Sequence, residues 1–237
     1  MYNSNNLKQN KIFYSIFSVS LVYFLLFSAF YLVCFIDKDG LYKLIMSERS
    51  FENLPFALTN DNLKLISEEL MKYISGRLQF LETKVTIDGV LTDFYSVRSK
   101  IHMADVRNLI VTFLKIYYIS IMCLIISFFK IIRYDKFLQI LKVIYKRVVV
   151  IISIVLTAIF AFAAINFETF FIRFHEVLFT NDLWLLDPSE DYIICLLPEK
   201  IFMIYGFRII ISMIISILFS LFVLQILSKI QSRQEAR

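Results

Sequence analysis

Four long apolar stretches, at residues 12–36, 108–129, 148–167 and 201–228, constrain the fold of this chain more than any other feature. Each has about 20 residues or more, enough to cross a hydrocarbon core of roughly 30 Å as a helix. With 59% hydrophobic residues, 25 phenylalanines and a mean hydropathy of +0.70, the chain is too apolar for a soluble domain. The sequence therefore predicts an α-helical polytopic membrane protein with four transmembrane helices.

The distribution of lysine and arginine predicts the orientation of these helices. Basic residues gather before the first stretch, between the second and third, and after the fourth, which places both termini and the middle loop in the cytoplasm. The two remaining segments, 37–107 and 168–200, then face outward. They hold both histidines and every acidic residue except Asp135 and Glu235. The net charge of +5 thus follows from topology and indicates no nucleic-acid partner.

The first apolar run is longer than the hydrophobic core of a cleaved signal peptide, so we interpret it as a retained membrane anchor. The expected organisation of the chain then has five parts. The parts are a cytoplasmic tail with the first transmembrane helix (1–36), an extracytoplasmic cap (37–107), the second and third transmembrane helices with a basic cytoplasmic loop (108–167), an outer aromatic and acidic segment (168–200), and the fourth transmembrane helix with a cytoplasmic tail (201–237).

The cap is expected to be a small α/β unit. Apolar residues recur at helical spacing over 63–74, with Asn60 or Asp61 available as N-cap and Gly76 available to end the helix. Beyond this amphipathic helix, alternating apolar residues on either side of the Asp-Gly pair at 88–89 predict a β-hairpin. So short a segment cannot bury a large core alone, so the cap is expected to lean on the helices or the bilayer surface.

The three cysteines, Cys34, Cys123 and Cys195, are too few and too scattered for a disulfide framework. A pair between Cys34 and Cys195 near the outer surface is a minor alternative. Cys195 lies among apolar residues, and such surroundings raise the pKa of a thiol and disfavour a nucleophile. We interpret it as a small buried hydrophobic residue.

The first histidine, His102, enters the second apolar stretch. If the chain is already helical there, Arg98, His102 and Asp105 lie on one face. Asp105 could then fix the imidazole tautomer and support its positive form, which would make His102 an oriented general base. The alternative is an interfacial helix with an ordinary salt-bridged surface.

The second histidine, His175, lies in the outer segment that follows the third apolar stretch. If the helix continues past that stretch, Phe171 and His175 share a face, with Glu168 one turn further back. Ionisable groups held near lipid are costly, which favours a functional cluster. The alternative is an aromatic belt at the bilayer interface. Candidate supporting residues in this segment are Glu168, Phe171, Glu176, Trp184 and Asp187.

Two cations, Lys115 and Arg208, interrupt the second and fourth apolar stretches. Each follows an outer-side basic residue by eight positions, about 12 Å along a helix, so we expect similar depths from the outer face. Their long side chains could simply reach the interface. Alternatively, they form a cationic lining beneath the outer site that suits a developing oxyanion or a lipid oxygen.

Several stretches of the sequence together resemble one family. They are Ile-His-Met-Ala-Asp-Val at 101–106, Phe-Phe-Ile-Arg-Phe-His-Glu-Val-Leu-Phe at 170–179, Asn-Asp-Leu-Trp-Leu-Leu-Asp-Pro at 181–188 and Leu-Pro-Glu-Lys-Ile-Phe at 197–202. With these stretches, its length and its four apolar segments, the chain resembles the bacterial lipoprotein intramolecular transacylases. The resemblance covers nearly the whole chain, and both histidines fall within the matching stretches.

The resemblance implies an activity and a site. The sn-2 acyl chain of a diacylglyceryl-cysteine would move to the α-amino group of the same N-terminal cysteine, giving the lyso-form lipoprotein. His102 and His175, at the family's histidine positions, would be the catalytic pair. The partners would be diacylated lipoproteins in the outer leaflet of the cytoplasmic membrane and the membrane lipids, with no cofactor. The site would lie at the extracytoplasmic face of a bacterial cell membrane.

The residues themselves suit such a reaction. Acyl transfer from an ester to an amine requires a base, an acid and donors for the oxyanion, and two imidazoles can divide the acid and base duties. Ester and amine belong to one molecule, so confinement can replace a covalent intermediate, and no serine or cysteine nucleophile is expected. Two alternatives remain. One is a zinc-dependent hydrolase, although the chain lacks a His-Glu-x-x-His pattern, and the other is a non-enzymatic transport or sensor protein.

Overall fold

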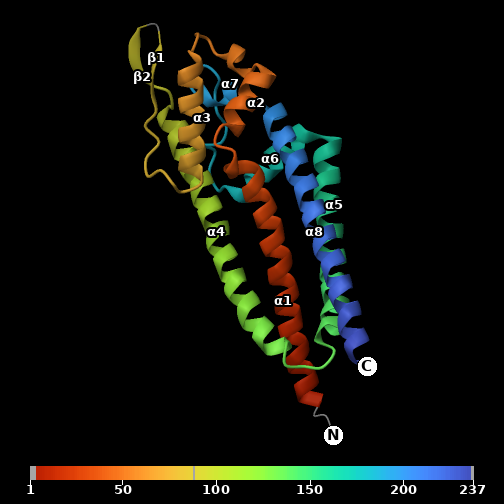
Figure 1. The fold of residues 1–237 in the computed structure, drawn as a ribbon. Coiled ribbons are helices and arrows are strands. Elements are labelled where there is room, and N and C mark those ends of the chain that lie inside the picture. The colour runs from red at the N-terminus through yellow and green to blue at the C-terminus, as the bar shows by residue number, and fades with distance from the viewer. Residues whose placement is uncertain (1–3, 88, 236–237) are drawn as a thin grey trace. The chain divides into compact units, whose positions relative to one another are not determined.

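The computed structural model describes residues 4–87 and 89–235, and its four longest helices are long and apolar enough to cross a membrane (Figure 1). These four are α1 (Ser4–Tyr31), α4 (Val97–Ile131), α5 (Phe137–Ile165) and α8 (Glu199–Glu235), and α1 continues as the π-helical turn η1 (Leu32–Ile36). The predicted fold class, a polytopic helical membrane protein with a small α/β part, is therefore confirmed.

Helices α4 and α8 extend at both ends beyond the apolar stretches that predicted them. Hydropathy marks only the part suited to lipid, whereas a helix continues until its backbone is capped. In α4 the cap is Ser96, whose Oγ accepts a hydrogen bond from the backbone N–H of Ser99 at 3.0 Å. The first polar turns of α4 are therefore continuous with its apolar part.

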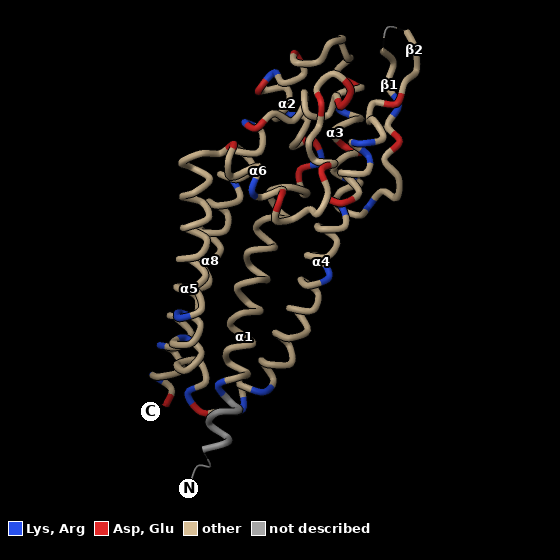
Figure 2. Tube along the Cα trace, turned by 180° about the vertical axis from the view of Figure 1, so that it is seen from behind, with Lys and Arg blue, Asp and Glu red and all other residues tan. Residues whose placement is uncertain are grey.

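The chain forms two compact units. The first comprises Met1–Phe30, Lys115–Ala161 and Ile209–Arg237. Its buried core is aliphatic and aromatic and consists of Tyr14, Val22, Ile131, Leu141, Tyr145, Val149 and Leu224. Figure 2 shows the helices of this unit tan over most of their length, with Lys and Arg gathered around the connection between α4 and α5 and near the end of α8. This distribution is the one expected of apolar membrane helices with basic connections.

The second unit comprises Tyr31–Leu114 and Phe162–Arg208. Besides parts of the long helices it contains α2 (Gly40–Glu48), the 3₁₀ turn η2 (Ser50–Asn53), α3 (Asn60–Ile74), β1 (Lys84–Ile87), β2 (Val90–Asp93), α6 (Phe167–Leu178) and α7 (Ile193–Leu196). Its core is the larger of the two and joins side chains far apart in sequence, among them Leu44, Leu63, Phe94, Met103 and Leu196. The cap segments and both histidines belong to this unit.

Helix α3 is the predicted amphipathic helix, with Leu63 and Leu70 among its buried residues. The predicted N-cap at Asn60 or Asp61 is wrong by one residue, because the Thr59 hydroxyl accepts the backbone N–H of Asn62 at 3.2 Å. Threonine is among the favoured N-cap residues, which accounts for the cap at this position.

The end of α3 and the hairpin follow the sequence pattern. Gly76 ends α3 with a φ of +80°, a conformation that favours glycine. Strands β1 and β2 pair antiparallel, with Lys84 opposite Asp93 and Ile87 opposite Val90, which confirms the predicted hairpin. Asp88, part of the predicted turn, lies outside the described residues.

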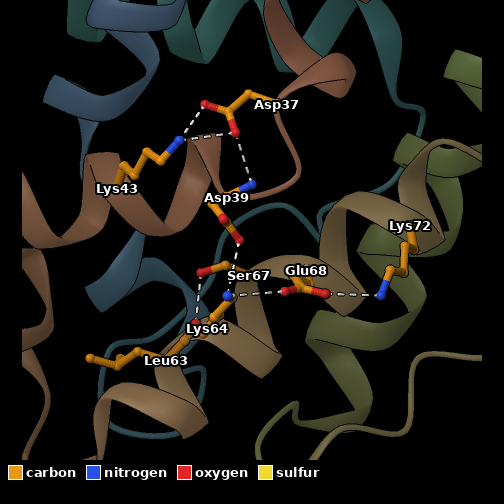
Figure 3. A network of polar contacts seen from close by, with 8 residues as sticks. All are labelled: Asp37, Asp39, Lys43, Leu63, Lys64, Ser67, Glu68 and Lys72. Atoms are coloured by element: carbon orange, nitrogen blue, oxygen red, sulfur yellow. Dashed lines mark hydrogen bonds and ion pairs between the residues drawn. The ribbon is translucent and has the colours of Figure 1, made fainter.

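A surface network of charges joins the start of α2 to α3 (Figure 3). The Lys43 ammonium lies 2.9 Å from the Asp37 carboxylate. The ammonium of Lys64, on α3, lies 3.4 Å from the Asp39 carboxylate and so connects this residue to α3. On α3, Glu68 pairs with Lys72 at 3.0 Å in an i,i+4 arrangement. All these groups are solvent-exposed or nearly so, so water screens them and burial of the apolar core stabilises this unit far more.

Candidate active site

The first histidine is held on the second turn of α4. Because α4 begins at Val97, Arg98, His102 and Asp105 lie in one continuous helix, as predicted. The His102 side chain is only 5% exposed, although the residue before it, Ile101, faces outward. The helix therefore directs this imidazole into the interior of its unit.

The second histidine lies in the last turn of a separate short helix, α6. The third apolar helix does not continue to His175, because α5 ends at Ile165 and Asn166 adopts an extended conformation. Asn166 then caps α6, since its Oδ1 accepts the backbone N–H of Thr169 at 2.9 Å. An asparagine side chain bonds its own following backbone readily, which breaks one helix and starts the next. The His175 side chain is 7% exposed.

The two imidazole rings meet. Their centroids are 5.9 Å apart, although the histidines are far apart in sequence. Phe179, the C-cap of α6, contacts both rings, edge-on to His102 at 5.1 Å and tilted against His175 at 5.7 Å. The chain thus brings its only two histidines to one place beside a shared phenylalanine.

Aromatic rings enclose His175. Phe171, one turn earlier on α6, lies 4.2 Å from it between centroids, and the only tryptophan, Trp184, stacks on it at 4.9 Å. Phe174 and Phe202 extend this group, the latter through Phe171 at 5.3 Å. Phe171 thus lies on the same face of α6 as His175, as expected from the spacing, Trp184 also contacts this ring, and the aromatics of this segment form a packed cluster.

One ring nitrogen of each histidine is constrained. Nδ1 of His175 lies 2.7 Å from the Phe171 carbonyl oxygen, which can only accept, so Nδ1 carries a proton and donates. In the neutral ring, Nε2 then holds the free lone pair. Nδ1 of His102 is buried and has no hydrogen-bond partner among the described residues.

Burial controls the charge of His175. Loss of solvent disfavours imidazolium and lowers the pKa of His175 below its ordinary value of 6.5, while the hydrogen bond to the Phe171 carbonyl opposes this effect. His175 is therefore neutral near pH 7 and able to accept a proton.

A surface pocket of about 530 Å³ lies next to the aromatic cluster, and neither histidine is among its lining residues. Phe179 and Trp184, which contact the histidine rings, also line this pocket. Its other lining residues mix apolar, amide and carboxylate groups and are Ile172, Glu176, Thr180, Asn181, Asp182 and Leu185. Such a lining can receive a molecule with both a polar and an apolar part.

The polar residues flanking His102 bond elsewhere. The Asp105 carboxylate accepts from the Asn181 side-chain amide at 3.0 Å, and His102 Nδ1 has no partner among the described residues, so Asp105 does not orient the ring by the hydrogen bond predicted from sequence. Arg98 donates from Nε to the Leu185 carbonyl at 3.0 Å and from Nη2 to the Asp182 carbonyl. A carboxylate on a helix surface can reach several hydrogen-bond donors, and residue spacing alone does not indicate which of them Asp105 accepts from.

The remaining predicted acids lie outside the ring cluster. Glu168 is exposed in the first turn of α6, and Glu176 is exposed and pairs with Arg173 at 2.7 Å. Asp187 closes a turn by accepting from the backbone and hydroxyl of Ser189, and these hydrogen bonds lower the pKa of its carboxyl. Of these three residues, only Glu176 lines the pocket.

The two predicted intramembrane cations are exposed. Arg208, on α8, has no hydrogen bond or ion pair to the histidine group within residues 4–87 and 89–235. Lys115 belongs to the first unit, whereas the histidines belong to the second. A cationic lining beneath the site thus stays a prediction.

Sequence reasoning missed one buried acid, Asp191. It is 2% exposed, and its carboxylate accepts from Ser96 and from Ser99, the latter at 2.9 Å, both in the cap and first turn of α4. Its neighbours Ser189 and Glu190 suggest an ordinary polar turn. Only Ser96, as a plausible N-cap of α4, gave a signal that this region is structured.

The described residues contain no group of three or more His, Cys, Asp or Glu side chains that could hold a metal ion. The zinc alternative therefore lacks its ligand set within the part of the chain that the structure describes. All three cysteines are free, so the minor disulfide alternative is wrong. Cys195 is buried, which raises the pKa of its thiol and agrees with the structural interpretation.

Comparisons with known proteins identify a family and a fold for the chain. A family model described as lipoprotein intramolecular transacylase Lit matches residues 15–202. A structure of the membrane-integral lipoprotein intramolecular transacylase Lit from Bacillus cereus aligns with a TM-score of 0.71 and 24% identity, covering 97% of this chain and 98% of that one. A search of curated protein sequences finds no match.

Two further structures of the Bacillus cereus protein carry a substitution of one histidine. The histidine-to-arginine variant aligns with a TM-score of 0.69 and 22% identity over 98% of this chain and 96% of that one. The histidine-to-alanine variant gives a TM-score of 0.68 and 22% identity over 98% of both chains. At these identities the structural likeness establishes the shared fold.

Proposed function

The chain belongs to the lipoprotein intramolecular transacylase family Lit, and from this premise we propose that His102 and His175 together carry out its acyl transfer. It is a membrane-integral acyltransferase whose substrate is a lipoprotein. The observation that carries the proposal is the meeting of the two imidazoles, 5.9 Å apart, inside an aromatic cluster.

The proposed reaction moves the sn-2 acyl chain of a diacylglyceryl-cysteine to the α-amino nitrogen of the same cysteine. An N–C bond forms, the ester C–O bond breaks, and one proton passes from nitrogen to the glyceryl oxygen. Both reacting groups belong to one molecule, so holding them together supplies an effective concentration that can exceed about 10⁵ M. No enzyme nucleophile is needed.

His175 is the proposed base. Its Nδ1 is committed to the Phe171 carbonyl, so Nε2 is available to take the proton of the attacking amine. Burial keeps the ring neutral near pH 7, where a base must be unprotonated. The α-amino group has a pKa of about 7.7–8.0, so a substantial neutral fraction exists at the same pH.

His102 is the proposed acid. Its Nδ1 is enclosed without a partner among the described residues, so Nε2 is the nitrogen left for the substrate. From there it would give a proton to the leaving glyceryl oxygen and recover one from His175, whose ring is adjacent, so that both rings end neutral. This exchange balances the proton that the amine loses.

The surroundings of the pair support acyl transfer over hydrolysis. Phe171, Phe179 and Trp184 surround the imidazoles and keep water from competing with the amine. The pocket that shares Phe179 and Trp184 would hold the polar end of the lipoprotein, since it also presents amide and carboxylate groups.

The proposed substrates are diacylated lipoproteins in the outer leaflet of the cytoplasmic membrane, with membrane lipids around them. We place both termini in the cytoplasm and the site at the extracytoplasmic face. The basic connection between α4 and α5 and the basic end of α8 support this orientation, as does the acidic content of the second unit.

Mass spectrometry of lipoprotein N-terminal peptides tests the function. Cells that make the protein should show one acyl chain on the cysteine nitrogen and one on glycerol, and cells without it should keep both on glycerol. His102→Ala and His175→Ala should each abolish the shift, whereas Glu190→Gln, an exposed change, should keep it. Retention of the shift in either histidine variant would contradict the proposed roles.

A further inference from the structure

Polar side chains on both sides of His102 hold one segment of the chain, residues 181–191. The hydrogen bonds of Arg98 and Asp105 attach the beginning and middle of this segment to α4. The third attachment is at its far end, where Asp191 meets the first turn of α4. The segment therefore follows α4 along its first turns.

Asp191 is the most enclosed of these attachments. Its Oδ1 accepts from the hydroxyls of Ser96 and Ser99, and its Oδ2 accepts the backbone N–H of Asp187 at 2.9 Å. Burying a carboxylate is costly unless its oxygens are bonded, and charge-assisted bonds of this kind are the stronger ones. This carboxylate is bonded on both oxygens and fixes the chain around it.

The attachments flank the first histidine. Ser99 precedes His102 by one helical turn and Asp105 follows it by one turn. The segment that they hold carries Trp184, whose ring lies on His175. Helix α4 thus carries His102 itself and, through these hydrogen bonds, positions Trp184, which contacts His175.

We propose that Asp191 is a positioning residue for the transacylation, which fixes the 181–191 segment on α4 so that Trp184 keeps His175 in register with His102. Asp191 contacts neither ring and acts through α4 and the segment. The inference rests on the proposed function of the histidine pair. It assigns a catalytic consequence to a buried acid outside the pair.

The test compares Asp191→Asn with Glu190→Gln, which removes the neighbouring exposed carboxylate. An asparagine side chain has one acceptor oxygen and cannot accept from both the serine hydroxyls and the Asp187 N–H, so the segment should shift on α4. A displacement of this kind can lower kcat by about 10²-fold, and KM should rise as well, because Trp184 and three other residues of the segment line the pocket. Glu190→Gln should match the unchanged protein in both constants.

The only tryptophan gives a second readout that does not depend on turnover. If the segment shifts, the Trp184 indole leaves the imidazole, its emission moves to longer wavelength, and acrylamide quenches it more strongly. Purified Asp191→Asn should show both changes, and Glu190→Gln should show neither. A folded Asp191→Asn protein with normal kcat, or with only a lower Tm, would overturn the inference.

Ser99→Ala decides the case in which Asp191→Asn does not fold. It removes one of the three donors and should lower kcat about fivefold, the equivalent of one typical hydrogen bond, with the same change in Trp184 emission. Unchanged kcat in this variant would refute the inference. Activity retained in His102→Ala or His175→Ala would instead refute the proposed function, while the emission of Trp184 would still report the geometry.

Discussion

The indole ring of Trp184 is stacked on the imidazole of His175, with centroids 4.9 Å apart and planes 26° from parallel. Because the chain has one tryptophan, its tryptophan fluorescence reports only on the surroundings of Trp184, which include His175. Charge on the imidazole can therefore be followed without a substrate.

Protonation of His175 should quench Trp184 fluorescence, since imidazolium quenches an indole in contact with it. Burial lowers the pKa of His175, so the midpoint of quenching should lie below 6.5. A pH titration of emission in detergent measures it. His175→Phe keeps an aromatic ring at the position and should remove the transition, and a transition that survives in this variant would show that another group causes it.

The acid limb of the activity profile should have two parts. The substrate amine, with a pKa of about 7.7–8.0, and His175 must both be neutral, so kcat/KM should fall about tenfold per pH unit below the amine pKa and more steeply below 6.5, where His175 is also protonated. Initial rates on a diacylated lipoprotein between pH 4 and 8 would show this. If kcat/KM keeps the same slope down to pH 4, with no steeper fall below 6.5, His175 is not the base.

The stability of the fold should decline over the same interval. Below pH 6.5 the unfolded chain binds a proton at this position while the folded chain, with its lowered pKa, does not, so His175 lowers the free energy of unfolding as pH falls toward the folded pKa. Thermal unfolding at several pH values, with His175→Phe for comparison, isolates the contribution. Equal pH dependence in both proteins would argue against it.

Metal removal should leave the activity intact, because the proposed chemistry uses two imidazoles and the described residues offer no three-ligand metal group. Purified protein treated with a strong chelator and then freed of it should turn over lipoprotein at the original rate. Loss of activity that added zinc restores would instead favour a metal-dependent hydrolase.

Gly76 should resist substitution by alanine. Its φ is +80°, and an added Cβ would lie 3.1 Å from Val111 Cγ2, so Gly76→Ala should lower stability. The left-handed conformation alone costs about 1–2 kcal/mol. Gly206→Ala is the matched control, because a Cβ there meets nothing within 4 Å and alanine favours a helix by about 0.5–1 kcal/mol. Thermal unfolding of both variants should show opposite shifts.

Much of the fold could be predicted from sequence because the signals are local. The four membrane helices follow from apolar length, and α3 and the hairpin follow from periods of 3.6 and 2. Local signals also placed His102 and His175 at the ends of helices. Helix boundaries were less certain, since Asn166 separates α5 from α6 within a run that hydropathy treats as continuous.

The site could be predicted only in part. Rare or aromatic residues in acidic surroundings give a visible pattern, which is why the sequence points to both histidines, Phe171 and Trp184, and the structure brings these four side chains together. The partner of Asp105 and the role of Asp191 depend on contacts between distant segments, which no local pattern records. The pairing of a carboxylate with one amide among several nearby donors is decided by packing.

The hydrogen bond from His175 Nδ1 ends on the main chain of Phe171. A change of side chain at position 171 leaves this carbonyl acceptor in place. Substitutions there therefore do not change which nitrogen of the neutral His175 ring is unprotonated. Drift in the neighbouring aromatics could alter the fit of the substrate and still leave the imidazole facing it with the same atom. Only a distortion of the last turns of α6 itself would break this hydrogen bond and allow the other tautomer of His175.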